Sequence, residues 1–224
     1  MVFYKIFCNK KKDDYMKNKR ILILAPHTDD GEFGCGGSIA RFLEEKNDVY
    51  YIAFSTAKES VPPGMPKNIL EIEVKEATKR LGIDQNKLII FRFTVRKLSY
   101  VRQDILENMV KINQDIKPDL VFMPSPHDTH QDHFTVANEG MRAFKKTSIL
   151  GYEIPWNNFT FQTQSFIHLK KRHIDKKVYA LNAYNSQKMK NYATKEYIES
   201  LAKIRGVQIS GEYAEAFEVI RWIM

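Results

Sequence analysis

Short apolar runs alternate with amphipathic stretches along the first half of the chain. Four runs have the length and the β-branched or aromatic content of buried strands: 21–24, 48–54, 88–93 and 120–123. Apolar residues recur at helical spacing in the segments between them, which predicts helices over 38–45, 68–81 and 102–116. Strands and helices that alternate in this way predict an α/β fold whose parallel sheet is built from βαβ units.

The second half of the chain is less regular. Apolar runs predict strands at 148–154 and 164–169, which we expect to be antiparallel at the edge of the sheet, and helices at 175–181 and 194–205. No internal repeat, low-complexity segment or linker divides the sequence. We therefore predict a single domain over residues 20–224, preceded by a flexible basic N-terminal extension over residues 1–19.

The net charge of +8 is concentrated near the N-terminus, where residues 1–20 hold seven Lys or Arg against two Asp. We expect a solvated tail, so nucleic acid is not a predicted partner; a positive rim that attracts an anionic substrate or a membrane surface is the alternative. No apolar run reaches the roughly 18 residues that cross a bilayer, and the N-terminus lacks the apolar core of a signal peptide. The prediction is a cytoplasmic protein without an integral membrane segment, with Cys8 and Cys35 as free thiols.

Ionisable residues gather after two of the predicted strands. Residues 26–37, after the first strand, contain one His, three acids and four Gly, and residues 126–133, after the fourth, contain three His. Buried charges are costly unless they pair or bind something. Because the carboxyl ends of parallel strands share one edge of a sheet, we expect the two loops to meet in one crevice. The sequence therefore predicts a metal site at that edge.

His27 and Asp30 are three residues apart and can reach one metal ion, with His133 from the second loop completing the set. Two imidazoles and one carboxylate suit Zn²⁺ with an open position for water, and Fe²⁺ or another divalent ion is the alternative. Asp29 is then a spare carboxylate that can act as general base toward that water.

His130 is predicted as a second catalytic residue. Asp132 lies two residues away and is expected to orient the imidazole and favour its protonated form. A charged His130 would stabilise an oxyanion or protonate a leaving nitrogen. The set of residues predicts metal-assisted hydrolysis of a carbonyl compound.

Three other interpretations of these loops are weaker. A dinucleotide site would need glycines spaced G-x-G-x-x-G and no preceding acids, and this loop has neither feature. In the second interpretation the histidines have only a structural role, capping helices and pairing locally. This role would account for a single histidine more readily than for several histidines beside paired acids. Cys35 as a nucleophile lacks a neighbouring positive group in the sequence to lower its pKa.

The motifs taken together resemble the PIG-L/LmbE-like family of zinc-dependent de-N-acetylases. They are Pro26-His27-Thr28-Asp29-Asp30-Gly31-Glu32, Gly34-Cys35-Gly36-Gly37 and His130-Gln131-Asp132-His133. Four further segments corroborate the resemblance: Leu81-Gly82, Tyr184-Asn185-Ser186-Gln187, Arg205-Gly206 and Tyr213-Ala214-Glu215-Ala216-Phe217. The resemblance implies a Rossmann-like three-layer fold with a mostly parallel central sheet.

The resemblance also implies removal of the N-acetyl group from an N-acetylglucosamine-type sugar or its conjugate. The matching positions are His27, Asp30 and His133 as metal ligands, Asp29 as base, and His130 with Asp132 as the second catalytic pair. The partner it implies is a small acetamido sugar or glycoconjugate, and homo-oligomers are an expectation for such proteins. A hydrolase of another amide, or a catalytically silent sugar-binding member, is the alternative.

Departures from the family pattern and some neighbouring residues shape further expectations. Thr28 and Gln131 stand where the family commonly has Pro, and the chain lacks the Arg that many members carry before the second helix's Glu. The resemblance implies a supporting role for Glu32. Trp156 is expected either beside a sugar pocket or in the core, and Glu215 either in the same pocket or paired with Arg205.

Overall fold

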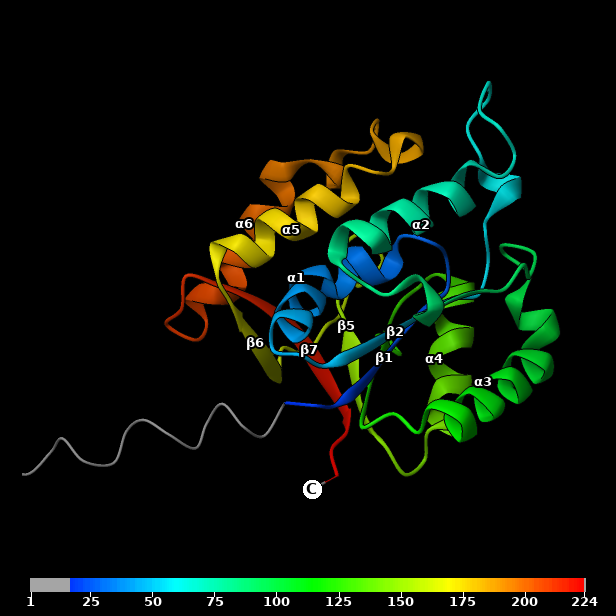
Figure 1. The fold of residues 1–224 in the computed structure, drawn as a ribbon, viewed down its shortest axis with the longest axis horizontal. Coiled ribbons are helices and arrows are strands. Elements are labelled where there is room, and N and C mark those ends of the chain that lie inside the picture. The colour runs from blue at the N-terminus through cyan, green and yellow to red at the C-terminus, as the bar shows by residue number, and fades with distance from the viewer. Residues whose placement is uncertain (1–16, 224) are drawn as a thin grey trace, which may run out of the picture.

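The computed structural model describes residues 17–223, so Cys8 and most of the predicted extension lie outside the described residues. Figure 1 shows a central sheet between two groups of helices. The strands are β1 Arg20–Ala25, β2 Asp48–Ala53, β3 Leu88–Ile90, β4 Leu120–Pro124, β5 Ser148–Tyr152, β6 Ser165–Leu169 and β7 Tyr213–Arg221. The helices are α1 Asp30–Glu44, α2 Ile69–Leu81, α3 Arg102–Ile116, α4 Gln131–Ala143, α5 Lys171–Leu181 and α6 Lys195–Val207.

The described strands form one seven-stranded sheet in the order β3-β2-β1-β4-β5-β7-β6. The pairs from β3 to β5 are parallel, whereas β7 is antiparallel to both of its neighbours. The predicted mostly parallel sheet is therefore confirmed. The antiparallel direction expected for the strand at 148–154 is wrong, because β5 is parallel to β4. The strand that runs antiparallel is β7, and the predicted strand β6 lies beside it at the edge. The chain order reverses between β1 and β4, and a crevice for ligands forms at the carboxyl ends of strands at such a point.

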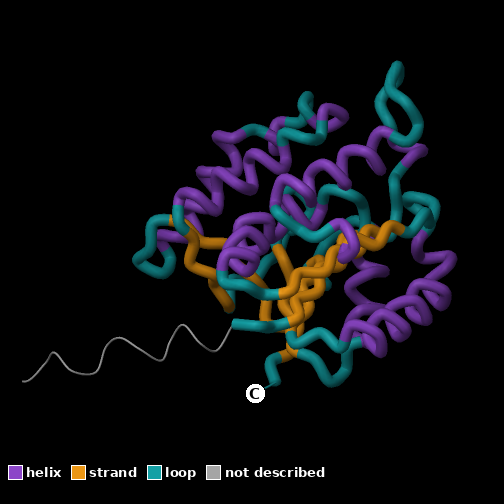
Figure 2. The backbone as a smooth tube through the Cα atoms, in the orientation of Figure 1, coloured by secondary structure: helices purple, strands orange, loops and turns teal. Residues whose placement is uncertain are grey.

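Alternate residues of the strands face two different helical layers. Ile21 and Ile23 of β1 belong to a core shared with α1, α2, α5 and α6, while Leu22 and Leu24 belong to a core shared with α3 and α4. Figures 1 and 2 show these two groups of helices on opposite faces of the sheet. Strands that are apolar on both faces suit a sheet covered on both sides. This is the predicted three-layer Rossmann-like fold. Within residues 17–223, no helix is both long and apolar enough to span a bilayer.

Helix α1 begins earlier than predicted, at Asp30 instead of residue 38, so the segment Gly34–Gly37 is helical and is not a turn. Its backbone is interrupted at Cys35, where φ is −145° and ψ is 24°. A Cβ on Gly34 would lie 2.3 Å from a ring atom of Tyr152 on β5. The glycines therefore let α1 pack closely on the sheet, and this tertiary packing outweighs their low helix propensity.

The sequence pattern does not predict strand β7. Alanines and glutamates alternate with its aromatic residues, so its apolar run is weak, and Glu215 and Glu218 are both buried. Other bounds also differ: β3 ends at Ile90 instead of residue 93, and α5 begins at Lys171 instead of residue 175. Buried charged residues need specific partners. Such partners therefore hold β7 in place where a hydrophobic pattern is missing.

Glu215 connects β7 to α1 and α5. Its carboxylate accepts hydrogen bonds from the backbone N–H groups of Gly37 and Ser38 at 3.0 and 2.7 Å, and from the Ser38 hydroxyl at 2.6 Å. Lys177 donates to the same carboxylate at 2.7 Å and to the Phe33 carbonyl at 2.6 Å. The expected pairing of Glu215 with Arg205 is therefore wrong. Arg205 instead forms an ion pair with Glu153.

Removal of the Glu215 carboxylate is expected to destabilise the fold strongly. Glu215→Ala leaves the buried Lys177 ammonium group without its counter-charge, although it keeps the Phe33 carbonyl, and leaves the N–H groups of Gly37 and Ser38 without their acceptor. We expect this to cost about 3–5 kcal/mol. Urea unfolding measures this loss as a lower midpoint, and Lys75→Ala, which breaks an exposed ion pair with Glu71, is the control. An equal, small effect of both substitutions would contradict the argument.

Candidate metal centre

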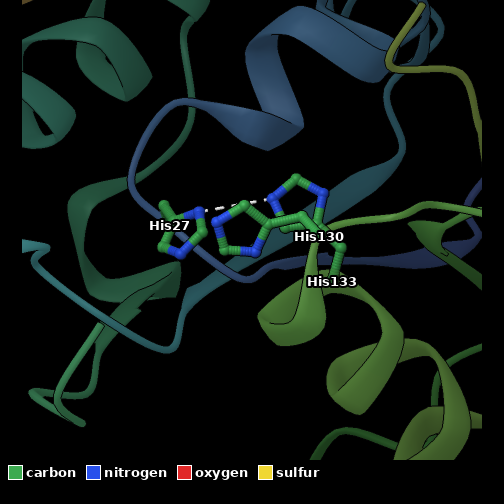
Figure 3. A group of neighbouring side chains, drawn as sticks. All are labelled: His27, His130 and His133. Carbon is green, nitrogen blue, oxygen red and sulfur yellow. Dashed lines mark hydrogen bonds between the residues drawn. The ribbon is translucent and has the colours of Figure 1, made fainter. Parts of the chain in front are cut away.

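The two predicted loops meet at the carboxyl ends of the adjacent strands β1 and β4. His27 follows β1 and Asp30 is the first residue of α1, while His130 is the N-cap of α4 and His133 lies in its first turn. Figure 3 shows the three imidazoles turned toward one another. One nitrogen from each of these histidines lies within 4.8 Å of the others, so the group could hold a metal ion.

The three predicted ligands form a compact triangle of donor atoms. His27 Nδ1 lies 3.2 Å from Asp30 Oδ2 and 3.3 Å from His133 Nε2, and Asp30 Oδ2 lies 3.2 Å from His133 Nε2. Metal–ligand bonds of about 2.0–2.1 Å in a tetrahedron imply donor atoms about 3.3 Å apart. The donor set therefore fits a tetrahedral divalent ion with one further position open.

Carboxylates contact the outer nitrogen of both histidine rings of this triangle. Asp128 lies 2.7 Å from His133 Nδ1, and Asp132 lies 3.0 Å from His27 Nε2. Each ring can donate its outer N–H to a carboxylate while its other nitrogen faces the triangle. Such partners fix the tautomer and orientation of metal-binding histidines. Asp128 is missing from the sequence prediction, although its position five residues before His133 in the same loop is a signal.

The Asp132 carboxylate is not hydrogen-bonded to the His130 ring, which corrects the sequence prediction. Besides His27, its carboxylate accepts from the backbone N–H groups of Arg96 at 2.5 Å and Leu98 at 3.2 Å. Residues two apart at a helix start do not face each other, so the side chains of His130 and Asp132 diverge. His130 Nδ1 instead accepts from the Asp132 backbone N–H at 3.1 Å, which leaves the ring proton on Nε2.

The charges at the triangle favour a cation. Burial alone would lower the pKa of both imidazoles, but Asp30 and the carboxylate hydrogen bonds raise the pKa of His27 to about 9 and that of His133 to about 10. Burial would raise the pKa of Asp30, yet the two imidazolium charges hold it well below its usual range. The carboxylates thus stabilise positive charge at this point, which a divalent ion would supply in place of protons.

Two neighbouring groups have pKa values shifted in opposite directions. Burial, reinforced by the charge of Asp30, raises the pKa of Asp29 to about 7. Burial and the nearby charges of His133 and His27 lower the pKa of His130 to about 4. This pKa favours the neutral imidazole of His130, whereas the sequence led us to expect the charged form.

Glu32 supports the loop between β1 and α1 from inside the core. It is fully buried, and its carboxyl group accepts hydrogen bonds from the hydroxyl groups of Tyr51 and Tyr184. The same hydroxyl oxygens lie 3.0 and 2.7 Å from the Thr28 carbonyl oxygen, which is the second acceptor available to each hydroxyl proton. Burial raises the pKa of Glu32 to about 8. These contacts agree with the supporting role expected from the sequence.

A cleft of about 420 Å³ opens over the triangle. Its lining includes Asp29, His130, Trp156 and Tyr192. The rings of Trp156 and Tyr192 stack with centroids 3.8 Å apart. Trp156 thus lines the cleft and also packs against the core. Glu215 is not part of this lining, so its expected place in the pocket is wrong.

His127, the remaining histidine of the second loop, does not join the group. Its side chain is 52% exposed, and Nδ1 lies 3.1 Å from a carboxylate oxygen of Glu218 on β7. Glu218 also accepts from the Ser125 hydroxyl at 2.5 Å. His127 therefore connects the loop to β7. It is a suitable control position for substitutions of the histidines that face the donor triangle.

Comparisons with known proteins show which family the chain belongs to. The PIG-L family model, described as GlcNAc-PI de-N-acetylase, matches residues 22–144. The chain is 30% identical over 176 residues to the uncharacterized deacetylase YaiS of Escherichia coli K12, covering 76% of this chain and 92% of that protein. It is 27% identical over 124 residues to a diacetylchitobiose deacetylase of Thermococcus kodakarensis, covering 51% of this chain and 45% of that protein.

Among solved structures, the conserved protein TT1542 from Thermus thermophilus superposes with a TM-score of 0.78 and 25% identity, over 92% of this chain and 96% of that one. This likeness covers nearly the whole of both chains. The family match also spans both histidine loops, which contain the motifs seen first in the sequence. The chain belongs to the PIG-L family of de-N-acetylases.

Proposed function

We propose that this protein is a metal-dependent N-deacetylase that acts on an acetamido sugar, free or within a larger conjugate. The observation that carries the proposal is the triangle of His27, Asp30 and His133 donor atoms, 3.2–3.3 Å apart at the floor of the cleft. Membership of the family supports the reaction, and the diacetylchitobiose deacetylase relative supports an acetylated amino sugar as substrate. Zn²⁺ suits two imidazoles and a carboxylate, with Fe²⁺ as the alternative.

A bound divalent ion would supply Lewis-acid polarisation of the acetamide carbonyl and a lowered pKa for water. Asp29 lines the cleft beside the proposed ligands, so its carboxylate can accept the proton of the attacking water. As the carbon–nitrogen bond breaks, that proton passes to the departing amine. The products are acetate and a free amino sugar.

His130 and the aromatic pair have separate tasks. The neutral His130 ring presents its Nε2–H as a hydrogen-bond donor, which can stabilise negative charge on the amide oxygen. Trp156 and Tyr192 offer an apolar face beside the cleft, and aromatic faces with nearby polar groups suit a sugar ring. Asp128 and Asp132 act through the histidines that they orient.

The proposal is tested by acetate release from a panel of acetamido sugars and their conjugates, with the metal-loaded protein. Acetate above the background of a chelated sample is the expected result. Metal bound without acetate from any substrate would favour a silent sugar-binding protein, and cleavage of other amides without acetate would favour a different amidase. A cytoplasmic location and homo-oligomer formation stay predictions of the sequence.

A further inference from the structure

Arg96 differs from every other arginine in the described chain. The guanidinium of Arg96 has no hydrogen bond or ion pair with any residue in 17–223, whereas each other arginine side chain has at least one partner. Those paired arginines are Arg20, Arg41, Arg80, Arg92, Arg102, Arg142, Arg172, Arg205 and Arg221. An arginine without a protein partner keeps all of its donors for a ligand.

The backbone of Arg96 is held in an unusual conformation. Its φ is +65°, in the left-handed region that glycine and asparagine occupy more readily. The 2.5 Å hydrogen bond from its N–H to Asp132 holds it there, and Asp132 also contacts His27. Lys46 and Lys117 share this backbone region, so the conformation fixes where the Arg96 side chain starts but does not by itself assign it a use.

Arg96 lines the same cleft as His27, Asp29 and His130. Lys190, from the segment between α5 and α6, lines it as well, and its amino group has no ion pair within residues 17–223. The acids of the cleft, Asp29 and Asp30, belong to the candidate metal centre and its base. Arg96 and Lys190, the two exposed cations of the cleft, therefore have no carboxylate partner among the residues that line it.

We propose that Arg96, assisted by Lys190, binds an anionic group on the part of the substrate beyond the acetamido sugar. This inference rests on the proposed function and names its substrate class: an acetamido sugar that carries a carboxylate or a phosphate. The planar guanidinium matches either group with two parallel hydrogen bonds, and a lysine adds a point charge.

The test compares matched substrates that share one sugar. The probes are the neutral methyl glycoside of N-acetylglucosamine, N-acetylglucosamine 1-phosphate and an N-acetylglucosamine glycoside with a carboxylate on its aglycone. The anionic preference is the ratio of kcat/KM for each anionic probe to that for the neutral one, and the two anionic arms distinguish phosphate from carboxylate. We expect a preference for at least one anion that weakens as salt screens the exposed charges.

Arg96→Gln is expected to lower this preference about tenfold, equivalent to about 1.4 kcal/mol, and Arg96→Lys is expected to lower it less. Lys97→Gln is the matched control, because Lys97 is the next residue and exposed, but does not line the cleft. We expect this control to change the preference by less than about twofold. A wild-type protein without anionic preference, or an equal effect of Arg96→Gln and Lys97→Gln, would overturn the inference while acetate release still supported deacetylation.

A binding measurement separates this inference from the proposed function. Calorimetry of the metal-loaded protein with glucosamine 1-phosphate and with methyl glucosaminide needs no turnover. Tighter binding of the phosphate, reduced about tenfold in Arg96→Gln, supports the inference even if no acetate is released. Equal affinities of the two sugars, and of the matching carboxylate compound, would refute it.

Discussion

Replacement of His133 by alanine is expected to abolish metal binding and acetate release together. His133 is 2% exposed, and its Nε2 is one corner of the donor triangle. Residues that only hydrogen-bond to metal ligands are worth about 10- to 100-fold in affinity or activity. Because His133→Ala removes a ligand and leaves Asp128 as a buried carboxylate without its imidazole, we expect a fall in kcat/KM of about 1,000-fold or more.

Metal analysis of purified, metal-loaded protein checks this result beside the activity measurement. His127→Ala is the matched control, because His127 lies in the same loop but contacts Glu218 and is outside the triangle. The control is expected to retain its metal. If His133→Ala bound metal as fully as His127→Ala did, the proposed ligand set would be incorrect.

Asp29→Asn is expected to leave the metal in place and to remove most of the turnover. The amide has nearly the shape of the carboxylate but cannot accept a proton from water, and a general base contributes about 100- to 10,000-fold to rate. We therefore expect kcat to fall by about that factor with little change in metal content. The measurement pairs acetate release with metal analysis of the same sample.

Asp115→Asn, on the exposed side of α3, is the control for exchanging a carboxyl group for an amide. The chemical change is the same in both substitutions, but only Asp29 lines the cleft. An Asp29→Asn protein that lost its metal as His133→Ala is expected to do would identify Asp29 as a ligand and not a base.

The sequence predicts the architecture and the place of the site because each rests on a local signal. Apolar runs such as Ile21–Leu24 mark the parallel strands, and parallel strands bring the loops after β1 and β4 to one edge. The packing partners of individual residues could not be predicted, because they depend on contacts that no local sequence pattern encodes. Gly34 leaves room for Tyr152 to approach α1 closely, and Lys177 and backbone N–H groups pair with Glu215, which is buried in β7.

The details of the site divide in the same way. His27, Asp30 and His133 have a recognisable spacing, and the structure brings their donor atoms together. The partner of Asp132 could not be predicted, because the choice between His130 and His27 depends on how the first turn of α4 faces the other loop. Arg96 gave no signal in the sequence, since a single arginine becomes unusual only when the partners of the others are known.

The hydrogen bond between Gly37 and Glu215 joins residues 178 positions apart, and it has a consequence for how the protein folds. Contacts between such distant residues form slowly, because a long loop must close before they contribute any stability. Helix α1 starts with Asp30, yet its glycine-rich middle is completed only when β7, near the end of the chain, has inserted between β5 and β6. During synthesis, both histidine loops would therefore leave the ribosome well before the strand that holds α1 against the sheet. Competence for metal binding is expected to be a late event in folding.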